Sequence, residues 1–133
     1  MKKVLIIFAS IVGIIAIIIS IGIIYLNRGL EEGKSVTFEH VDLTTIEDGV
    51  YIGSYNHYRF STTVEVTVEN HEIVDLNCLD DVTFANQETW NIIEARVLEQ
   101  NTYQVDVYTG ATVTSNSYLK AIENALLKAT RNE

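Results

Sequence analysis

Hydroxyl side chains crowd one short stretch of this 133-residue chain, Asp106-Val-Tyr-Thr-Gly-Ala-Thr-Val-Thr-Ser-Asn-Ser117. Five of them lie within nine residues, around a Gly-Ala pair: Thr109, Thr112, Thr114, Ser115 and Ser117. The stretch suits the attachment of a large ligand, because Gly110 can adopt backbone angles closed to other residues and Ala111 adds little bulk. The same residue types also form ordinary turns and helix N-caps, so composition alone leaves both interpretations open.

The residues that precede this stretch predict an antiparallel sheet. Over residues 62–69, Val64, Val66 and Val68 alternate with polar side chains, the pattern of a half-buried strand. Asn70-His71 then suits a tight hairpin, because Asn tolerates positive φ, and residues 73–79 form the return strand. A short strand at residues 50–52 comes before the hairpin. Residues 103–107 alternate again and predict a fourth, short strand.

Two segments have the periodicity of amphipathic helices. Residues 87–100 place Trp90, Ile93 and Val97 on one face, with Asn86 as the expected N-cap. A second helix is expected over residues 117–129, on the apolar stripe of Leu119, Ile122, Ala125, Leu126 and Ala129. The element order predicts an α+β fold in which two helices pack on a small antiparallel sheet.

An apolar run precedes this domain and predicts a transmembrane helix. Residues 4–26 are 23 residues without a charge, and about 20 suffice to span the hydrocarbon core of a bilayer. Lys2 and Lys3 precede the run, so residues 1–3 are expected in the cytoplasm and the domain outside. A cleaved signal sequence is the competing interpretation, but the apolar core of a signal sequence, roughly 7–15 residues, is shorter than this run. Residues 27–40 are expected to be a tether and an extended lead-in to a domain over residues 41–133.

The charge of the exported part argues against some partners. All 18 acidic residues but only seven of the nine Lys and Arg lie after position 26, which gives that part a formal charge of −11. Nucleic acid and anionic membrane surfaces are therefore not expected as partners. Cys78 is the only cysteine, so it cannot form an intrachain disulfide, and we expect it to pack as a small apolar residue. The sequence has no zinc-site spacing, phosphate-loop motif or nucleophile elbow, and Asp75, Asp80 and Asp81 are interpreted as solvated loop acids.

The segment Tyr55-Asn-His-Tyr-Arg-Phe60 gathers four rings in six residues. Such a segment can stack on a planar ligand or simply cover a sheet edge. The sequence does not decide between these two roles.

The core of the hydroxyl-rich stretch, Asp106-x-x-Thr109-Gly110-Ala111-Thr112-x-Thr114-Ser115, resembles the flavinylation motif of the FMN-binding domain family. This domain occurs in subunits of sodium-translocating NADH:quinone reductases, in related electron-transport proteins and in small membrane-anchored extracytoplasmic flavoproteins. The resemblance covers roughly residues 41–129, in the order Val41-Asp-Leu43, Asp48-Gly-Val-Tyr-Ile-Gly53, the hairpin at 64–68, Ile92-Ile93 and residues 121–126. The chain departs from the family where Tyr55–Phe60 replaces common glycines, and where a Pro-Gly before the first helix is missing.

The resemblance implies that Thr114 carries FMN through a phosphoester bond that a flavin transferase installs. It also implies six further motif residues of the cofactor site: Asp106, Thr109, Gly110, Ala111, Thr112 and Ser115. The protein would be an electron carrier rather than a stand-alone enzyme, with a membrane reductase or quinol as donor and an extracytoplasmic acceptor. Two alternatives stay open, a non-covalent FMN-binding module and a flavin-free domain that binds a partner.

Overall fold

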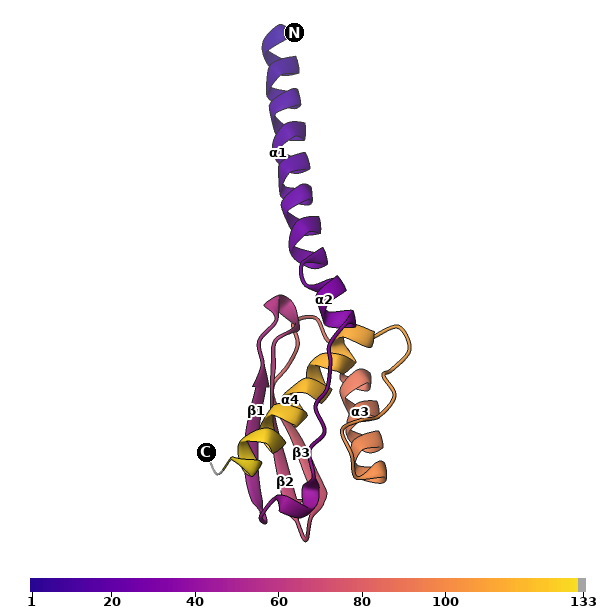
Figure 1. The fold of residues 1–133 in the computed structure, drawn as a ribbon. Helices are drawn as coiled ribbons and strands as arrows, with labels where there is room; N and C mark the ends of the chain where they lie inside the picture. The colour runs from indigo at the N-terminus through magenta and orange to yellow at the C-terminus, as the bar shows by residue number, and fades with distance from the viewer. Residues whose placement is uncertain (132–133) are drawn as a thin grey trace.

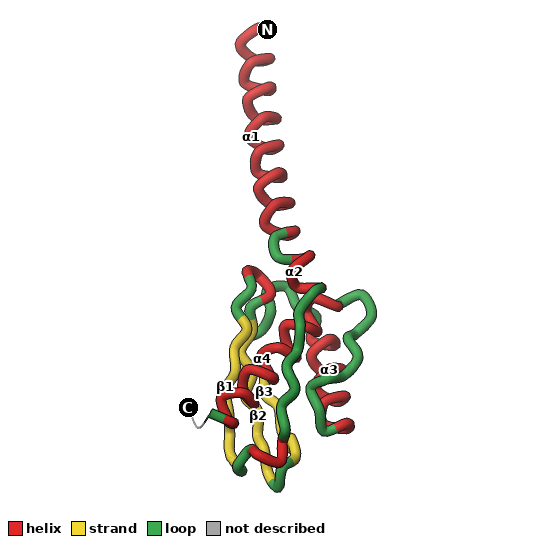
Figure 2. The backbone as a smooth tube through the Cα atoms, viewed as in Figure 1, coloured by secondary structure: helices red, strands yellow, loops and turns green. Residues whose placement is uncertain are grey.

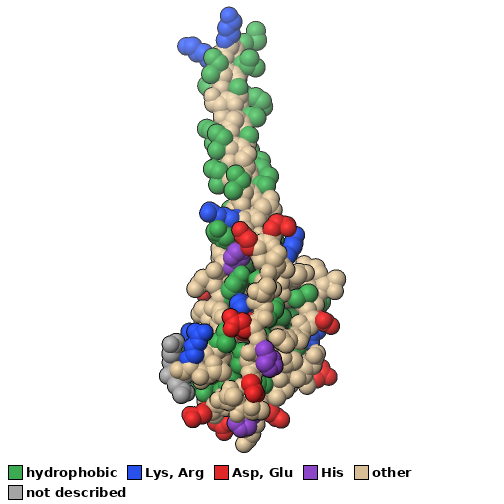
Figure 3. Space-filling view, viewed as in Figure 1, with side chains coloured by type: hydrophobic (Ala, Val, Ile, Leu, Met, Phe, Trp, Pro, Cys, Tyr) green, Lys and Arg blue, Asp and Glu red, His purple; other side chains and the backbone are tan. Residues whose placement is uncertain are grey.

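The computed structural model describes residues 1–131 as a long helix that projects from a small domain (Figure 1). The projecting helix, α1, spans Lys2–Asn27, and all of its residues lie outside the packed core. It is long and apolar enough to cross a membrane, by length and composition. Figure 3 shows that the apolar side chains of α1 give way to charged ones where the helix meets the domain.

The chain directly after α1 is a docked helix and not the tether that was predicted. Leu30–Lys34 form helix α2, which packs against helix α4, Thr112–Thr130. Gly33 is buried in this contact, and its carbonyl oxygen accepts a 2.9 Å hydrogen bond from Asn116 Nδ2. A five-residue helix that contains a glycine has little intrinsic stability. Tertiary contacts therefore hold α2 in place.

Three antiparallel strands form the sheet in chain order: β1, Gly49–Tyr55; β2, Thr62–Glu69; and β3, Glu72–Asp80 (Figure 2). The predicted hairpin is confirmed. Asn70 and His71 have φ of 51° and 65°, as a two-residue turn matched to the twist of the strands requires. The alternation along β2 leaves Val64, Val66 and Val68 fully buried on one face of the sheet.

Both long helices cover that face. Helix α4 crosses β1 and β2, while helix α3, Gln87–Gln100, packs beside it against β3 (Figure 1). The predicted N-cap of α3 is confirmed, because Asn86 Oδ1 accepts a 3.0 Å hydrogen bond from the Glu88 amide. Two short 3₁₀ turns, Leu43–Thr45 and Tyr58–Phe60, complete the elements of residues 1–131. The α+β class, with an antiparallel sheet, two packed helices and a preceding apolar helix, is thus confirmed.

Helix α4 fits closely against the edge strand β1. A Cβ at Gly53 would lie 2.8 Å from Ala125 Cα, so glycine lets the two backbones approach. Asn124 Nδ2 and Lys128 Nζ donate hydrogen bonds of 2.9 and 3.0 Å to the carbonyl oxygens of Ser54 and Ile52. These side chains satisfy carbonyl groups that an edge strand would otherwise leave open to a second chain.

Two predicted elements differ from the structure. Residues 103–107 are not a strand but an extended connection, in which Tyr103 is buried and its hydroxyl donates a hydrogen bond to the Glu39 carbonyl oxygen. Helix α4 begins at Thr112, five residues before the predicted start. The second half of the hydroxyl-rich stretch, from Thr112 on, therefore forms the first turns of a helix instead of a loop in front of it.

Candidate functional site

A tight turn leads the chain into α4. The Ala111 amide donates a 3.0 Å hydrogen bond to the Tyr108 carbonyl oxygen, and Gly110 within the turn has φ of 86°, which favours glycine. A Cβ at Gly110 would meet no atom within 4 Å, so the turn is open on that side. Arg96 of α3 fixes the extended segment before the turn by donating from Nη1 to the Asp106 and Val107 carbonyl oxygens, at 2.6 and 3.0 Å.

The structure separates the hydroxyls of this stretch into two groups. Ser115 is fully buried, where its Oγ donates to the Ala111 carbonyl oxygen at 2.8 Å and accepts from the Tyr108 amide at 3.1 Å. Ser117 is also buried and donates to the Val113 carbonyl oxygen at 2.9 Å. Both serines therefore hold the turn and the helix together. Thr114, by contrast, is half-buried and lines a cavity.

Thr114 is the third residue of α4, and not a residue just before the helix as the sequence suggested. The first helical hydrogen bond runs from the Ser115 amide to the Ala111 carbonyl oxygen, at 2.9 Å. The amides of Thr112, Val113 and Thr114 have no acceptor within the helix for that reason. The N-cap position is Ala111, whose side chain cannot accept a hydrogen bond. The helix thus begins with open amide donors and the positive end of its dipole beside Thr114.

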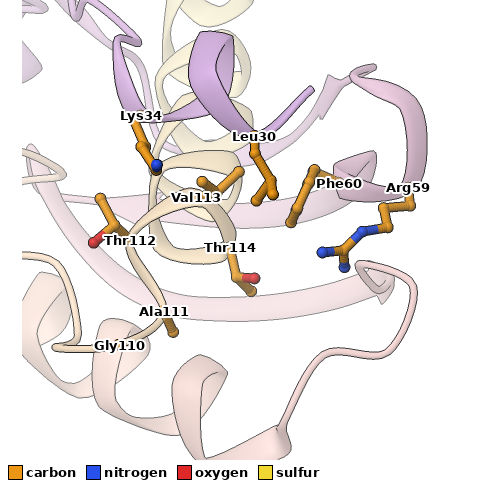
Figure 4. A pocket seen from close by; sticks show the side chains of 9 residues that line it. All are labelled: Leu30, Lys34, Arg59, Phe60, Gly110, Ala111, Thr112, Val113 and Thr114. Atoms are coloured by element: carbon orange, nitrogen blue, oxygen red, sulfur yellow. The ribbon is translucent and has the colours of Figure 1, made fainter. Parts of the chain in front are cut away.

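A cavity of about 290 Å³ lies at the start of α4 (Figure 4). One wall is the start of α4, with Val113 and Thr114, and the turn before it. The opposite wall comes from α2 and from the 3₁₀ turn before β2, segments more than 50 residues earlier in the chain. The lining residues are Leu30, Lys34, Arg59, Phe60, Gly110, Ala111, Thr112, Val113 and Thr114.

Two cations lie at this cavity in a domain that is otherwise strongly acidic. In Figure 4 the Arg59 guanidinium extends towards Thr114, and the Lys34 ammonium lies beside Val113 and Thr112. Arg59 Cζ lies 4.0 Å from the centre of the Phe60 ring. Lys34 is paired with Glu31 at 2.8 Å, but both side chains are more than half exposed, and such pairs are weak enough to exchange partners. The cavity therefore offers positive charge as well as free amides to an anion.

The structure brings together only part of the predicted site. Of its seven residues, four line the cavity: Gly110, Ala111, Thr112 and Thr114. Ser115 lies behind them in its structural role. Asp106 and Thr109 are exposed and do not line the cavity. Phe60 belongs to the aromatic segment that the sequence left open as a ligand-stacking candidate. The sequence did not single out Leu30, Lys34, Arg59 or Val113, and it offered no signal for the first two beyond their place after the apolar helix.

The aromatic segment also takes a definite place. Phe60 and Arg59 line the cavity, whereas Tyr55, His57 and Tyr58 do not. His57 stacks on Tyr55, with ring centroids 5.6 Å apart, and its Nε2 lies 2.9 Å from the Gly29 carbonyl oxygen. Most of this segment therefore contacts the end of α1, away from the candidate site.

The sequence model of the FMN-binding domain family matches residues 58–127, slightly more than half of the chain. The chain belongs to this family. The match contains the start of α4 and reaches upstream to Arg59 and Phe60 of the cavity. No curated protein matches the chain. The crystal structure of the CPE2226 protein from Clostridium perfringens is similar in fold, with a TM-score of 0.52 and 18% sequence identity, over 66% of this chain and 92% of that one.

The residues at the cavity of this FMN-binding domain fit the chemistry of the cofactor. A flavin mononucleotide combines a phosphate with a large planar ring system. The open amides, Arg59 and Lys34 suit the phosphate, while Leu30, Phe60 and Val113 provide apolar surface. A volume of about 290 Å³ is at the lower end for ligand pockets. The cavity therefore suits the phosphate and adjoining atoms, with the rest of the nucleotide at the opening.

Proposed function

We propose that this protein is a membrane-anchored extracytoplasmic flavoprotein that carries FMN covalently on Thr114 and acts as an electron carrier. The observation that supports it best is the start of α4. A helix that begins with alanine at its N-cap lacks the side-chain acceptor that most helices use, a deficit of about 1 kcal/mol. A phosphate esterified to Thr114, in the first turn, would supply the missing acceptor and the negative charge that the helix dipole favours.

Two hydroxyls of the stretch line the cavity and remain available for attachment, Thr112 and Thr114, and the motif register favours Thr114. Ser115 and Ser117 are committed to backbone carbonyl oxygens, and Thr109 lies outside the cavity lining. In the attachment step the Thr114 hydroxyl attacks the phosphorus of a flavin dinucleotide held by a flavin transferase. One phosphorus–oxygen bond forms, the diphosphate bond breaks, a nucleoside monophosphate leaves, and the hydroxyl proton passes to solvent.

The bound flavin supplies redox chemistry, because FMN exchanges one or two electrons, and the protein sets its access and potential. Lys2 and Lys3 at the start of α1 support an orientation with the N-terminus in the cytoplasm and the domain outside. We infer a membrane reductase or quinol as electron donor and an extracytoplasmic electron acceptor. This assignment makes the chain a carrier within a redox system and not an enzyme by itself.

Co-expression of the full chain with a flavin transferase tests the attachment. The parent should fluoresce as a flavoprotein on a denaturing gel and show the mass increment of one esterified FMN. Thr114→Ala should lose both signals, whereas Thr114→Ser should keep them because it retains the hydroxyl. Thr112→Ala tests the alternative attachment hydroxyl, since Thr112 lines the same cavity on the exposed side, and it should keep both signals if Thr114 carries the flavin.

Each other outcome contradicts part of the proposal. Fluorescence in Thr114→Ala equal to that of the parent would place the attachment elsewhere. A yellow native protein that loses all flavin on denaturation would be a non-covalent FMN-binding module. A protein that stays colourless in the presence of transferase and flavin would be a flavin-free domain.

A further inference from the structure

The end of α1 is joined to the domain by the segment Tyr55–Phe60. His57 Nε2 lies 2.9 Å from the Gly29 carbonyl oxygen, and Arg59 Nε donates a 3.1 Å hydrogen bond to the Leu26 carbonyl oxygen. The Arg28 guanidinium lies 4.6 Å from the centre of the Tyr58 ring, a cation–π contact. Side chains of the domain thus contact backbone carbonyl oxygens at the end of α1 and in its connection to α2.

The fit at this junction is close on two sides. Gly29 has φ of 85°, and a Cβ there would lie 2.7 Å from His57 Nε2 and 2.8 Å from Tyr58 Cδ2. A Cβ at Gly33 in α2 would overlap Val113 Cγ1. The helix end and the domain therefore interlock, and the surface of the domain beside α1 keeps a fixed position relative to that helix.

This surface exposes two aromatic rings on strained backbone. Phe84 is 78% exposed and has φ of 62°, while Tyr58 is 52% exposed and has φ of 51°. Positive φ is unfavourable for bulky residues and persists where something else requires it. The two rings belong to one end of the domain, because the Thr83 amide donates a 2.9 Å hydrogen bond to the Arg59 carbonyl oxygen. Packing inside the domain does not account for a phenylalanine with this exposure.

Cations accompany these rings. Arg28, Lys34 and Arg59 are three of the seven Lys and Arg that follow residue 26, and all lie at the end of the domain that faces α1. Glu31 and Glu32 lie there as well, so the local charge is mixed and not strongly positive (Figure 3). Aromatic rings beside cations, at the end of an apolar helix, are the composition found at the interface between a membrane and water.

We propose that the end of the domain formed by Arg28, Tyr58, Arg59 and Phe84 rests in the lipid headgroup layer, with the Phe84 ring inserted. The proposal rests on the membrane anchor of the proposed function, and it does not require flavin. The cavity shares Arg59 with this surface, and its α2 residues lie within roughly 12 Å of the end of α1, at about 1.5 Å per residue. The cofactor site would then open beside the headgroups, within reach of lipid-soluble electron donors.

Nitroxide quenching of a fluorescent label tests this contact in the full chain. In a Cys78→Ser background, Phe84→Cys is labelled with bimane and reconstituted in zwitterionic phosphatidylcholine vesicles that contain a headgroup nitroxide lipid. Val50→Cys is the matched control, because Val50 is an exposed apolar side chain, 58% accessible, near the opposite end of the domain. We expect several-fold stronger quenching at position 84 than at position 50.

Flotation of the same vesicles separates the possible failures. A chain that does not float with the vesicles contradicts the anchor, and with it the proposed localisation. A chain that floats but shows equal quenching at both positions overturns the headgroup contact alone. A second variant, Phe84→Gly, relieves the positive φ and should raise the Tm of the domain in detergent. A lower Tm would make Phe84 a structural residue and would also overturn the proposal.

Discussion

Gly53→Ala tests the close fit between β1 and α4 that positions Thr114. The new Cβ would lie 2.8 Å from Ala125 Cα, and the Ala121 carbonyl oxygen and Ala125 amide nitrogen would be closer still. Carbon atoms pack best at 3.5–4.0 Å, so the helix would have to move by about 1 Å. The clash involves only backbone atoms, which no rotamer change can relieve. Overpacking costs about 1–3 kcal/mol, and we expect the upper part of this range.

Part of that cost is offset, because alanine restricts the unfolded chain more than glycine, by about 0.4–1 kcal/mol. The net loss in the free energy of unfolding is therefore about 2 kcal/mol. For a domain of this size it corresponds to a Tm lower by roughly 8–16 °C. The hydrogen bonds from Asn124 and Lys128 to β1 would also lengthen, and we expect Gly53→Ala to yield less flavinylated protein near its Tm.

The fluorescence of Trp90 measures this loss. It is the only tryptophan of the chain and packs edge-on against Tyr118 of α4, with ring centroids 5.1 Å apart, so it reports on the domain and not on α1. Gly49→Ala is the matched control, since its Cβ would meet the end of the flexible Tyr51 side chain at 3.2 Å. If Gly53→Ala melts within a few degrees of Gly49→Ala, the backbone contact does not limit the packing of α4.

Two further predictions concern Ala111 and Cys78. Ala111→Ser adds an N-cap acceptor to α4, so it should stabilise the flavin-free domain by about 0.5–2 kcal/mol and lower the yield of covalent flavin by occupying the open amides. The control, Ala95→Ser at an exposed interior position of α3, should slightly destabilise the domain instead. Equal effects of the two substitutions on Tm would contradict the capping argument. Burial, with a smaller contribution from the nearby Asp81 and Asp80 carboxylates, raises the pKa of Cys78. The pH midpoint of its alkylation by iodoacetamide should therefore be higher in the native chain than in urea, and stability should fall as pH rises past the pKa of the unfolded thiol; identical midpoints would contradict the burial.

The local sequence pattern was sufficient to predict those elements whose bounds are set by their own residues. The hairpin and α3 were predicted to within one or two residues, because β2 alternates and Asn86 caps a regular apolar stripe. The predicted strand over residues 103–107 was wrong although its alternation is real. Tyr103 is buried against Glu39, and the carbonyl oxygens of Asp106 and Val107 accept from Arg96 instead of a neighbouring strand. An alternating pattern indicates that one side of an extended segment faces the core, and it does not require that the segment pair with a neighbouring strand.

The start of α4 was missed because hydroxyl side chains compete with the helical backbone and favour turns. In the structure Ser115 and Ser117 donate to carbonyl oxygens four residues earlier, within the helix itself. The motif thus identified Thr114 as the candidate, but its place in the first turn came only from the structure. Lys34 and Arg59 could not be predicted as site residues, because their proximity to Thr114 depends on the docking of α2 and of the 3₁₀ turn before β2.

Several positions where local preference is violated lie at the two surfaces proposed to meet other molecules. Ala111 is a poor N-cap, and it lines the cavity proposed for the phosphate together with Gly110 of the preceding turn. Tyr58 and Phe84 are bulky residues at positive φ, and both are exposed beside the end of α1. Such conflicts cost stability and persist where the chain meets something outside itself. The same reasoning that assigns a phosphate to the first pair therefore assigns a headgroup layer to the second, and each assignment can fail without the other.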